Sequence, residues 1–345
     1  MRSAIERMWY GGAGPVWLAP LSFLYGAVMA VRSVLYRLGL RHRVRVGAPV
    51  IVIGNLTVGG TGKTPLVAWL ATQLAAFGMR VAIVSRGYGG RARGVNRVTL
   101  HSRASEVGDE PLLLARRSQA TVFIGKDRVA AAKAAVADRA DIVICDDGLQ
   151  HLALKRDCEI VVIDGQRGFG NGCLLPRGPL RERPGRLRRV NAVVVNGAVT
   201  RPGFELPNFV KGTHFAMSLR PGDAFPVSGG ASLRALASFR GSGVHAVAAI
   251  GNPQRFFDML RNAGITVYEH PLPDHHPFKP GDLNFGDTLP VLMTEKDAVK
   301  CAAFADERCW FVPVTAEFPD GEARGLVDLV LARVHAHDMA GKKSG

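Results

Sequence analysis

The chain of 345 residues is long enough for one large domain or two medium ones, and its 47% hydrophobic and 21% charged residues exclude a disordered chain. A formal net charge of +15 favours an anionic partner: nucleic acid, an anionic membrane or a phosphorylated substrate. The five cysteines form no CxxC pair, so neither a disulfide framework nor a zinc site is expected, and a reducing compartment fits best.

The N-terminal segment carries no formal charge between Trp9 and Val31. Glycines and prolines crowd its first half, so the pattern predicts a helix only from about Pro20 to Leu38. An apolar stripe at three–four spacing runs along this helix through Leu21, Leu24, Val28, Val31, Leu35 and Leu38. Several arginines follow the stripe, which favours a helix lying in the interface of a membrane with anionic lipids. A membrane-spanning helix and a buried core helix remain alternatives.

A glycine-rich loop follows the next predicted strand. Residues 49–54 form a β-branched apolar run that predicts a buried strand, and a helix is expected over residues 63–77, before a strand at 80–85. This order is the setting of a phosphate-binding loop. Its glycines allow backbone N–H groups to point at phosphates, Lys63 can bridge the β- and γ-phosphates, and Thr64 can ligate Mg²⁺. The predicted ATP-binding residues are Thr57, Val58, Gly59, Gly60, Thr61, Gly62, Lys63, Thr64 and Pro65.

This loop departs from the G-x-x-x-x-G-K-[ST] pattern, because Thr57 stands where the first glycine is expected. It also resembles the loop of partitioning-type ATPases, but neither Thr57 nor Val58 supplies their signature lysine. A glycine-rich turn with a chance Gly-Lys-Thr is the alternative, and it would have to coincide with both flanking strands. Because ATP is found in the cytoplasm, a nucleotide site argues against reading the N-terminal segment as a cleaved signal peptide.

Two carboxylates, Asp146 and Asp147, follow the predicted buried strand at 141–145. The carboxyl ends of parallel strands meet at one edge of a sheet, so these side chains should lie beside the glycine-rich loop. Carboxylates at this place can hold Mg²⁺ directly or through water. Thr64, Asp146 and Asp147 are therefore the predicted metal ligands, although either aspartate could instead cap the following turn.

A basic stretch runs from Arg177 to Arg189 and contains six arginines. A substrate phosphate, the phosphates of ATP and anionic headgroups all need cationic partners, although a solvated basic loop is the alternative. No aromatic residues are interleaved for base stacking, so no nucleic acid partner is expected. A P-loop ATPase that positions a membrane partner is the other rival, and the missing signature lysine weakens it.

The predicted strands and helices alternate along the chain, which is typical of a doubly wound α/β sheet. A second set of alternating elements follows and predicts a smaller α/β domain. The expected fold class is thus a P-loop NTPase-like doubly wound parallel sheet with a second, smaller α/β domain and an N-terminal membrane-associated helix. The expected division is an anchor at 1–45, a P-loop domain at 46–190 and a second domain at 191–340 that completes the cleft.

Further polar segments follow apolar runs at residues 85–90, 108–111, 174–182, 250–257, 273–278 and 294–300. With the loop at 54–65 and the segment at 146–151, in this order, they closely resemble the tetraacyldisaccharide 4′-kinase (lipid A 4′-kinase) family as far as about Thr315. The resemblance implies transfer of the ATP γ-phosphate, with Mg²⁺, to the 4′-hydroxyl of a tetraacylated diglucosamine 1-phosphate. It also implies a location at the cytoplasmic face of the inner membrane, and a monomer is expected.

The resemblance further implies roles for individual residues. The implied catalytic residues are Asp109 as general base, His275 as its assistant, and Lys63. The implied substrate-binding residues are Asn55, Arg86, Arg181 and Glu182. Judged without the family, Asp109 fits equally well as the N-cap of a helix opening at Pro111, and a loop histidine is usually a surface residue. A sugar hydroxyl is a poor nucleophile, however, and a base that accepts its proton is what the chemistry needs.

Overall fold

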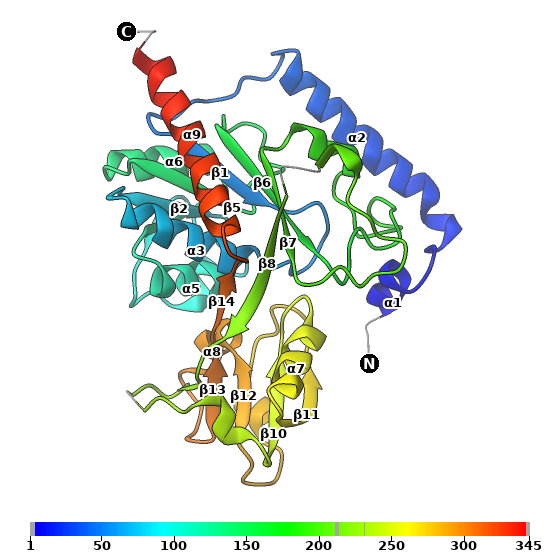
Figure 1. The fold of residues 1–345 in the computed structure, drawn as a ribbon, viewed down its shortest axis with the longest axis vertical. Helices are drawn as coiled ribbons and strands as arrows, with labels where there is room; N and C mark the ends of the chain where they lie inside the picture. Colours follow the sequence, from blue (N-terminus) through cyan, green and yellow to red (C-terminus); the bar gives the residue numbers. More distant parts are fainter. Residues whose placement is uncertain (1–3, 211–213, 231, 343–345) are drawn as a thin grey trace.

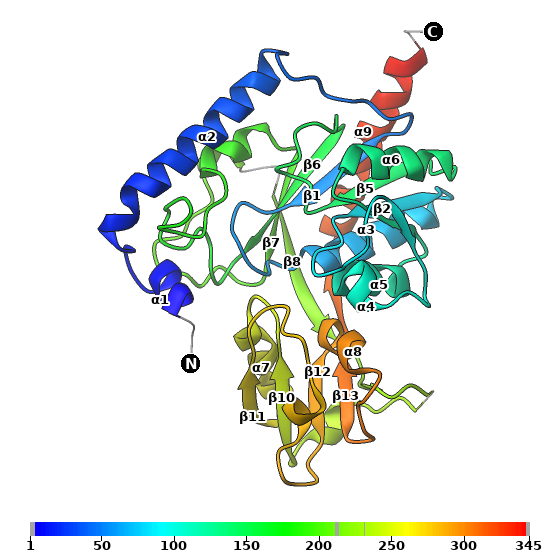
Figure 2. The ribbon, with the colours of Figure 1, turned by 180° about the vertical axis from the view of Figure 1, so that it is seen from behind.

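The computed structural model describes residues 4–210, 214–230 and 232–342. These residues form a large sheet with helices on both faces and a smaller α/β unit that lies beyond one end of it (Figures 1 and 2). An N-terminal helical arm runs along the outside of the large sheet. The arm consists of α1 (Ala4–Tyr10), the 3-10 turn η1 (Val16–Leu18) and α2 (Ala19–Arg37).

The large sheet has nine strands within the described residues, in the spatial order β14-β8-β7-β6-β1-β5-β2-β4-β3. The bounds are β1 (Val50–Gly54), β2 (Val81–Ser85), β3 (Asn96–Val98), β4 (Thr121–Ile124), β5 (Ile142–Asp146), β6 (Cys158–Asp164), β7 (Ala192–Asn196), β8 (His214–Pro221) and β14 (Val314–Glu317). The strands from β8 to β4 run parallel, and β14 and β3 are antiparallel edges. The central strands are buried along their whole length, as expected where helices cover both faces.

Helices cover both faces of this sheet. The helices on the first face are α3 (Lys63–Ala76), α5 (Asp109–Arg117) and α9 (Glu322–Lys342), whose apolar residues share one buried cluster with the strands. On the other face, alanines of α6 (Arg128–Ala137) pack against the opposite side chains of the same strands. A single turn, α4 (Ala104–Val107), precedes α5. The predicted doubly wound α/β class is confirmed.

The smaller unit contains a sheet of order β11-β10-β12-β13-β9 in the described part of the chain. Its strands are β9 (Phe225–Pro226), β10 (Gly243–Ala248), β11 (Thr266–Pro271), β12 (Val291–Thr294) and β13 (Cys309–Val312). Its helical elements are η4 (Leu236–Phe239), α7 (Pro253–Asn262), η5 (Pro280–Leu283) and α8 (Glu295–Cys301). Phenylalanines of α7 pack on one face of this sheet, and α8 packs on the other.

The predicted boundary at residue 190 has to be corrected. Strands β7 and β8 continue the large sheet, since β7 pairs with β6 and β8 pairs with β7. After the smaller unit the chain returns to the large sheet as β14 and α9. The smaller unit is therefore an insertion that spans β9 to β13. A short buried apolar run such as β7 fits either sheet equally well, so its pattern cannot assign it.

The α2 helix begins and ends within one residue of the prediction, and its apolar stripe faces outward. Leu21, Leu24, Val28 and Val31 are 52–60% exposed. Together η1 and α2 form a 22-residue segment, Val16–Arg37, which is long and apolar enough to cross a membrane, and only 11% of its apolar window is buried. A buried core helix is thus wrong for this segment, whereas an interfacial and a spanning helix both remain compatible with its exposure.

The inner side of α2 is hydrogen-bonded to the loop between β6 and β7. The Ser22 hydroxyl donates to the Leu174 carbonyl over 2.6 Å, and the Tyr25 hydroxyl donates to the Arg181 carbonyl over 3.1 Å. One face of α2 is consequently fixed to the body of the protein, while the apolar face is left outside.

Candidate active site

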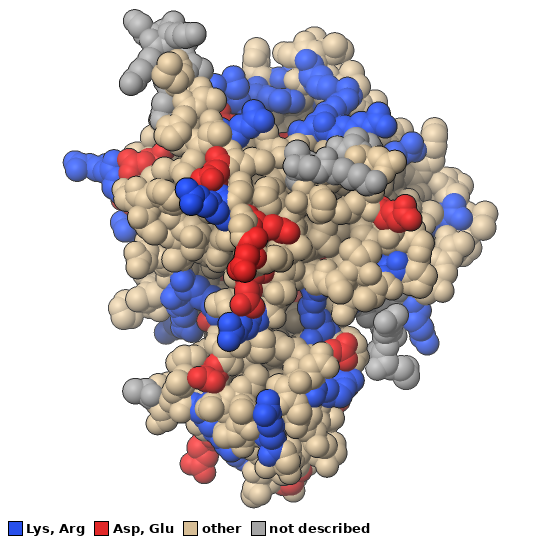
Figure 3. All heavy atoms as spheres, viewed as in Figure 1, with Lys and Arg blue, Asp and Glu red and all other residues tan. Residues whose placement is uncertain are grey.

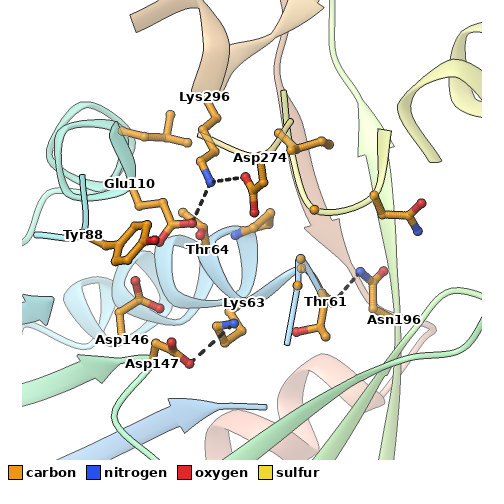
Figure 4. A pocket seen from close by; sticks show the side chains of 18 of the residues that line it. Thr61, Lys63, Thr64, Tyr88, Glu110, Asp146, Asp147, Asn196, Asp274 and Lys296 are labelled. Atoms are coloured by element: carbon orange, nitrogen blue, oxygen red, sulfur yellow. Dashed lines mark hydrogen bonds and ion pairs between the residues drawn. The ribbon is translucent and has the colours of Figure 1, made fainter. Parts of the chain in front are cut away.

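A cavity of about 1000 Å³ lies between the two units. Its lining comes from the loop after β1, the segment after β5 and the start of α5 on one side. The loops after β10 and β11 and the start of α8 line the other side. In Figure 4, Lys63, Thr64, Asp146 and Asp147 approach from the large sheet, and Asp274 and Lys296 approach from the smaller unit. A cleft outside the carboxyl ends of parallel strands is where α/β proteins place their ligands.

The loop after β1 is held in shape by backbone-directed hydrogen bonds. Gly62 has a φ of 91°, which a side chain would strain, and α3 begins directly after it. The Asn55 amide donates to the Gly59 carbonyl over 3.2 Å, and the Asn196 amide donates to the Thr61 carbonyl over 2.9 Å. The backbone N–H groups at the start of α3 are thereby positioned before any ligand arrives.

Most of the predicted ATP-binding residues line the cavity, namely residues 58–65. Thr57 does not: it is buried and forms a bridge with Leu180 instead. Asn55, predicted at the substrate, is also fully buried and braces the loop from behind. Both residues sit at the base of a loop that turns its later residues outward, and sequence spacing does not reveal that change of direction.

Asp147 is an anion held between two cations. Its carboxylate lies 3.6 Å from Lys63 Nζ and 3.0 Å from Arg181 Nη1. Burial raises the pKa of Asp147, but the charges of Lys63 and Arg181 outweigh burial and lower the pKa to about 2. The backbone of Asp147 has a φ of 49°, a strained value of the kind that persists at functional sites. Asp147 is therefore ionised and fixed at the rim of the glycine-rich loop after β1.

Asp146 has the opposite electrostatic character. Its side chain is buried, and its Oδ1 atom has no hydrogen-bond partner. Burial and the charges of Glu110 and Asp147 raise the pKa of Asp146, and Lys63 offsets only part of that effect. A buried carboxylate oxygen without a partner costs free energy unless a cation satisfies it.

Together with the Thr64 hydroxyl, Asp146 and Asp147 give a set of hard oxygen donors that fits Mg²⁺, which binds few protein ligands and otherwise phosphate and water. No cluster of three or more His, Cys, Asp or Glu side chains suited to a metal occurs among the described residues. A magnesium ion at this place would consequently depend on the nucleotide's phosphates for part of its coordination.

Asp109 and His275 meet across the two units. Asp109 Oδ2 lies 3.1 Å from His275 Nδ1, and the Tyr88 ring lies 4.7 Å from the His275 ring. Asp109 is the first residue of α5 rather than its N-cap, which is Gly108. His275 has a φ of 61°, a second strained backbone at this cavity. His275 lines the cavity, whereas Asp109 is 5% exposed and does not, so His275 is the member of the pair that faces a ligand.

The predicted substrate-binding residues divide into two groups. Arg86 and Arg181 line the cavity. Asn55 and Glu182 do not. The Glu182 carboxylate accepts from Gln150 Nε2 over 2.9 Å, so it holds a neighbour in place instead of facing the cavity. Within the basic stretch at 177–189, only Arg181 lines the cavity.

Several lining residues were not predicted as site residues, among them Arg32, Tyr88, Glu110, Arg128, Asn196 and Lys296. Tyr88, Glu110 and Lys296 lie inside segments that sequence analysis had marked without assigning them a role. Asn196 is the last residue of the buried strand β7, and a polar residue at a strand's carboxyl end is a usable signal for a ligand-facing position in an α/β protein. Arg32 is on the outer arm, and no local pattern connects it with the cavity.

Contacts beside the cavity fasten the smaller unit against the carboxyl end of the large sheet and the glycine-rich loop after β1. Arg167 Nη1 donates to the Gly251 carbonyl over 2.6 Å, and Arg255 Nη1 lies 3.2 Å from Asp164 Oδ2. Gly251 packs so closely on Gly60 that a Cβ atom at Gly251 would collide with the Gly60 backbone nitrogen. The cavity is thus closed on one side by backbone.

A glycine-rich loop between a parallel strand and a helix, two aspartates at the carboxyl end of the neighbouring strand and an Asp–His pair across the cleft define a P-loop phosphotransferase. The family model for tetraacyldisaccharide-1-P 4′-kinases matches residues 15–334. The chain belongs to this family of ATP-dependent lipid-sugar kinases.

Individual relatives agree with this assignment. The chain is 52% identical over 325 residues to a tetraacyldisaccharide 4′-kinase of Alkalilimnicola ehrlichii. This match covers 92% of this chain and 93% of that protein. It is 47% identical over 333 residues to one of Methylobacillus flagellatus, with coverages of 96% and 95%. The structure resembles the crystal structure of LpxK from Aquifex aeolicus in complex with ATP. The TM-score is 0.73 at 29% identity, and the match covers 92% of this chain and 98% of that one.

Proposed function

We propose that this protein transfers the γ-phosphate of ATP to the 4′-hydroxyl of a tetraacylated diglucosamine 1-phosphate, with catalysis by Lys63, Asp109 and His275. The observation that carries the residue assignment is that Lys63 of the large unit and His275 of the smaller unit line one cavity, with Asp109 of the large unit hydrogen-bonded to His275 behind its wall. Phosphoryl transfer needs little covalent chemistry from the protein, so positioning and electrostatic stabilisation are the main contributions.

Residues 58–65 would hold the phosphates of ATP. The backbone N–H groups of the loop and the start of α3 suit anionic oxygens, and the Lys63 ammonium at the cavity wall suits the β- and γ-phosphates. Support for ATP as the nucleotide comes from the structural relative crystallised with ATP.

Thr64, Asp146 and Asp147 would hold Mg²⁺, because they supply hydroxyl and carboxylate oxygens at one edge of the loop. When bound, the ion would neutralise part of the charge on the transferring phosphate. Asp146, with its unpartnered buried oxygen, is the residue whose charge such an ion would stabilise most.

The Asp109–His275 pair would accept the proton of the acceptor hydroxyl. An ionised carboxylate accepts hydrogen bonds only, so Asp109 takes the Nδ1–H of His275 and leaves Nε2 as an acceptor. Nε2 belongs to the residue that lines the cavity, which is where a hydroxyl would arrive. Arg86 and Arg181, which also line the cavity, would bind the anionic sugar substrate.

The outer arm would place the cavity at the cytoplasmic face of the inner membrane. The exposed apolar face of α2 suits acyl chains, and Arg37, Arg41 and Arg43 follow it on the surface. Figure 3 shows Lys and Arg side chains gathered over the upper edge of the molecule, above the end of α2. Arginines beside anionic headgroups contribute about 1 kcal/mol each. Since α2 also contacts the loop carrying Arg181, a lipid-borne acceptor would arrive next to the cavity.

Replacing Leu24 and Val28 with glutamate is expected to release the protein from vesicles that contain anionic lipid. The two side chains are 60% and 58% exposed, and each would lose roughly 1.5–3 kcal/mol of apolar burial in the membrane. Vesicle sedimentation should show a membrane partition coefficient that is at least about tenfold lower for each of the two residues replaced. Leu100→Glu is the matched control, because Leu100 is 61% exposed and lies away from the arm. Equal membrane binding of the double variant and the control would contradict the anchor.

The proposed activity is tested by incubating the purified protein with Mg·ATP and a tetraacyl disaccharide 1-phosphate dispersed in detergent. A doubly phosphorylated disaccharide is expected, with its new phosphate on the 4′-oxygen. Chelation of Mg²⁺ should stop product formation, and restored Mg²⁺ should recover it. If the protein binds Mg·ATP and yet no glycolipid acquires a phosphate, the proposal is wrong.

A further inference from the structure

The segment at 294–300 was marked in the sequence, and the proposed function leaves it without a role. It forms the N-cap and the body of α8. The Thr294 hydroxyl accepts from the Asp297 backbone N–H over 3.2 Å. The Asp297 carboxylate is buried and accepts the Ala249 N–H over 2.9 Å. The start of α8 is therefore fixed to the end of β10, within the smaller unit.

The charged side chains of α8 reach across the cleft to α5 of the large sheet. The cross-cleft pairs are Arg117 Nε with Glu295 Oε2 at 2.8 Å, Lys296 Nζ with Glu110 Oε1 at 3.0 Å, and Lys300 Nζ with Asp109 Oδ2 at 3.4 Å. The two lysines are one helical turn apart, so they present their ammonium groups on one face of α8.

The Asp109 carboxylate is where these charges converge. Besides the His275 ring at 3.1 Å and Lys300 at 3.4 Å, Lys296 Nζ lies 3.9 Å from the same Oδ2 atom. Lys296 Nζ also lies 3.4 Å from Asp274 Oδ1 and 3.5 Å from His275 Nε2. Figure 4 shows Lys296 reaching between Glu110 and Asp274 from the opposite unit. Lys296 thus contacts both members of the pair and the two carboxylates beside them, Glu110 and Asp274.

Two cations are needed here because Asp109 is buried. Burial by itself raises the pKa of this carboxyl, and a neutral carboxyl would no longer hold the Nδ1–H of His275 as an anion does. The hydrogen bond with His275 and the charges of Lys296 and Lys300 outweigh burial and hold the pKa of Asp109 well below its usual range. The pKa of Lys296 itself is raised: burial lowers it, but the charges of Glu110, Asp109 and Asp274 outweigh that effect.

We propose that Lys296 and Lys300 are positioning residues for phosphoryl transfer, which keep Asp109 anionic from the opposite unit so that His275 presents Nε2 to the acceptor hydroxyl. This inference rests on the proposed function for its catalytic consequence, although its electrostatic content concerns the protein alone. The lysines belong to the smaller unit and Asp109 to the large sheet. The Asp109–His275 pair therefore has its two neighbouring cations only where α8 lies against α5.

The variants Lys296→Met and Lys300→Met test the inference by removing one charge each while keeping the length of the side chain. Titration of the Asp109 carboxyl by ¹³C NMR, without substrate, should show its pKa raised by about one unit or more in each variant. A positioned base increases the rate by about 10²–10⁴-fold, and each variant should lose part of that increase. We therefore expect kcat to fall at least about tenfold while KM for ATP stays unchanged. The acid limb of the kcat–pH profile should move to higher pH, since removing a cation increases the proton affinity of the pair.

The matched variants keep the test decisive. Lys296→Arg and Lys300→Arg retain the charge and should titrate like the wild type, whereas Lys155→Met removes a charge from an exposed lysine and should change nothing. An unmoved Asp109 titration in both methionine variants would overturn the inference, and so would a lower kcat with an unmoved acid limb, which is what a purely structural contact gives. If the wild type forms no product at all, the proposed function has failed, and the NMR titration still decides whether the lysines control Asp109.

Discussion

Replacing Lys63 with methionine is expected to remove nearly all turnover, by at least about 10²–10³-fold in kcat. Its ammonium is the cation of the glycine-rich loop that lies at the cavity wall, 3.6 Å from Asp147, where the terminal phosphates of ATP would sit. Methionine keeps the chain length and removes the charge that stabilises the transferring phosphate. Initial rates of phosphate transfer from labelled ATP measure the loss.

The control for this substitution is Lys133→Met on α6, because Lys133 is exposed and does not line the cavity. The control should keep wild-type rates. Asp147 retains Arg181 as its partner when Lys63 is lost, so the folded structure should survive, and circular dichroism can verify this. Turnover within threefold of the wild type in Lys63→Met would mean that this loop does not hold the reacting phosphates.

The second large effect is expected for Asp109→Asn, which should lower kcat by about 10²–10⁴-fold while ATP still binds. Asparagine has the shape of aspartate but no negative charge, so it no longer stabilises the positive charge that the His275 ring gains when Nε2 accepts a proton. Asp109 does not line the cavity, and the affinity for ATP should therefore remain close to that of the wild type. Steady-state kinetics and calorimetric titration with ATP separate the two effects.

A neighbouring Asp–His pair provides the matched control. His276 Nε2 lies 3.0 Å from Asp282 Oδ2, one residue beyond His275, and neither residue lines the cavity. Asp282→Asn should leave kcat unchanged. That result would show that the loss of an aspartate–histidine contact in this loop does not by itself lower kcat. Normal turnover in Asp109→Asn would show that the base assignment is wrong.

The sequence by itself determined the features that depend on neighbouring residues. The run of β-branched residues in β1, the glycines after it and the helix opening at Lys63 are consecutive, so spacing alone predicts the loop. Asp146 and Asp147 were placed correctly beside that loop, because β5 is parallel to β1 and their carboxyl ends meet at one edge. The apolar stripe of α2 also follows from helical periodicity alone, whereas its exposure to the outside is seen only in the folded structure.

Only the tertiary structure decided which distant residues meet and which way they face. Asp109 and His275 are 166 residues apart, and without the family resemblance no local pattern would pair them or place Lys296 beside both. Periodicity reports burial but not the partner, so β7 and β8 were assigned to the wrong unit. Asn55 and Glu182 were expected at the cavity, but Asn55 is fully buried and Glu182 binds Gln150 instead. The physical reason is that such contacts join segments that are far apart in the chain, within one unit or between the two, so their geometry depends on how the whole chain packs and not on any stretch of it.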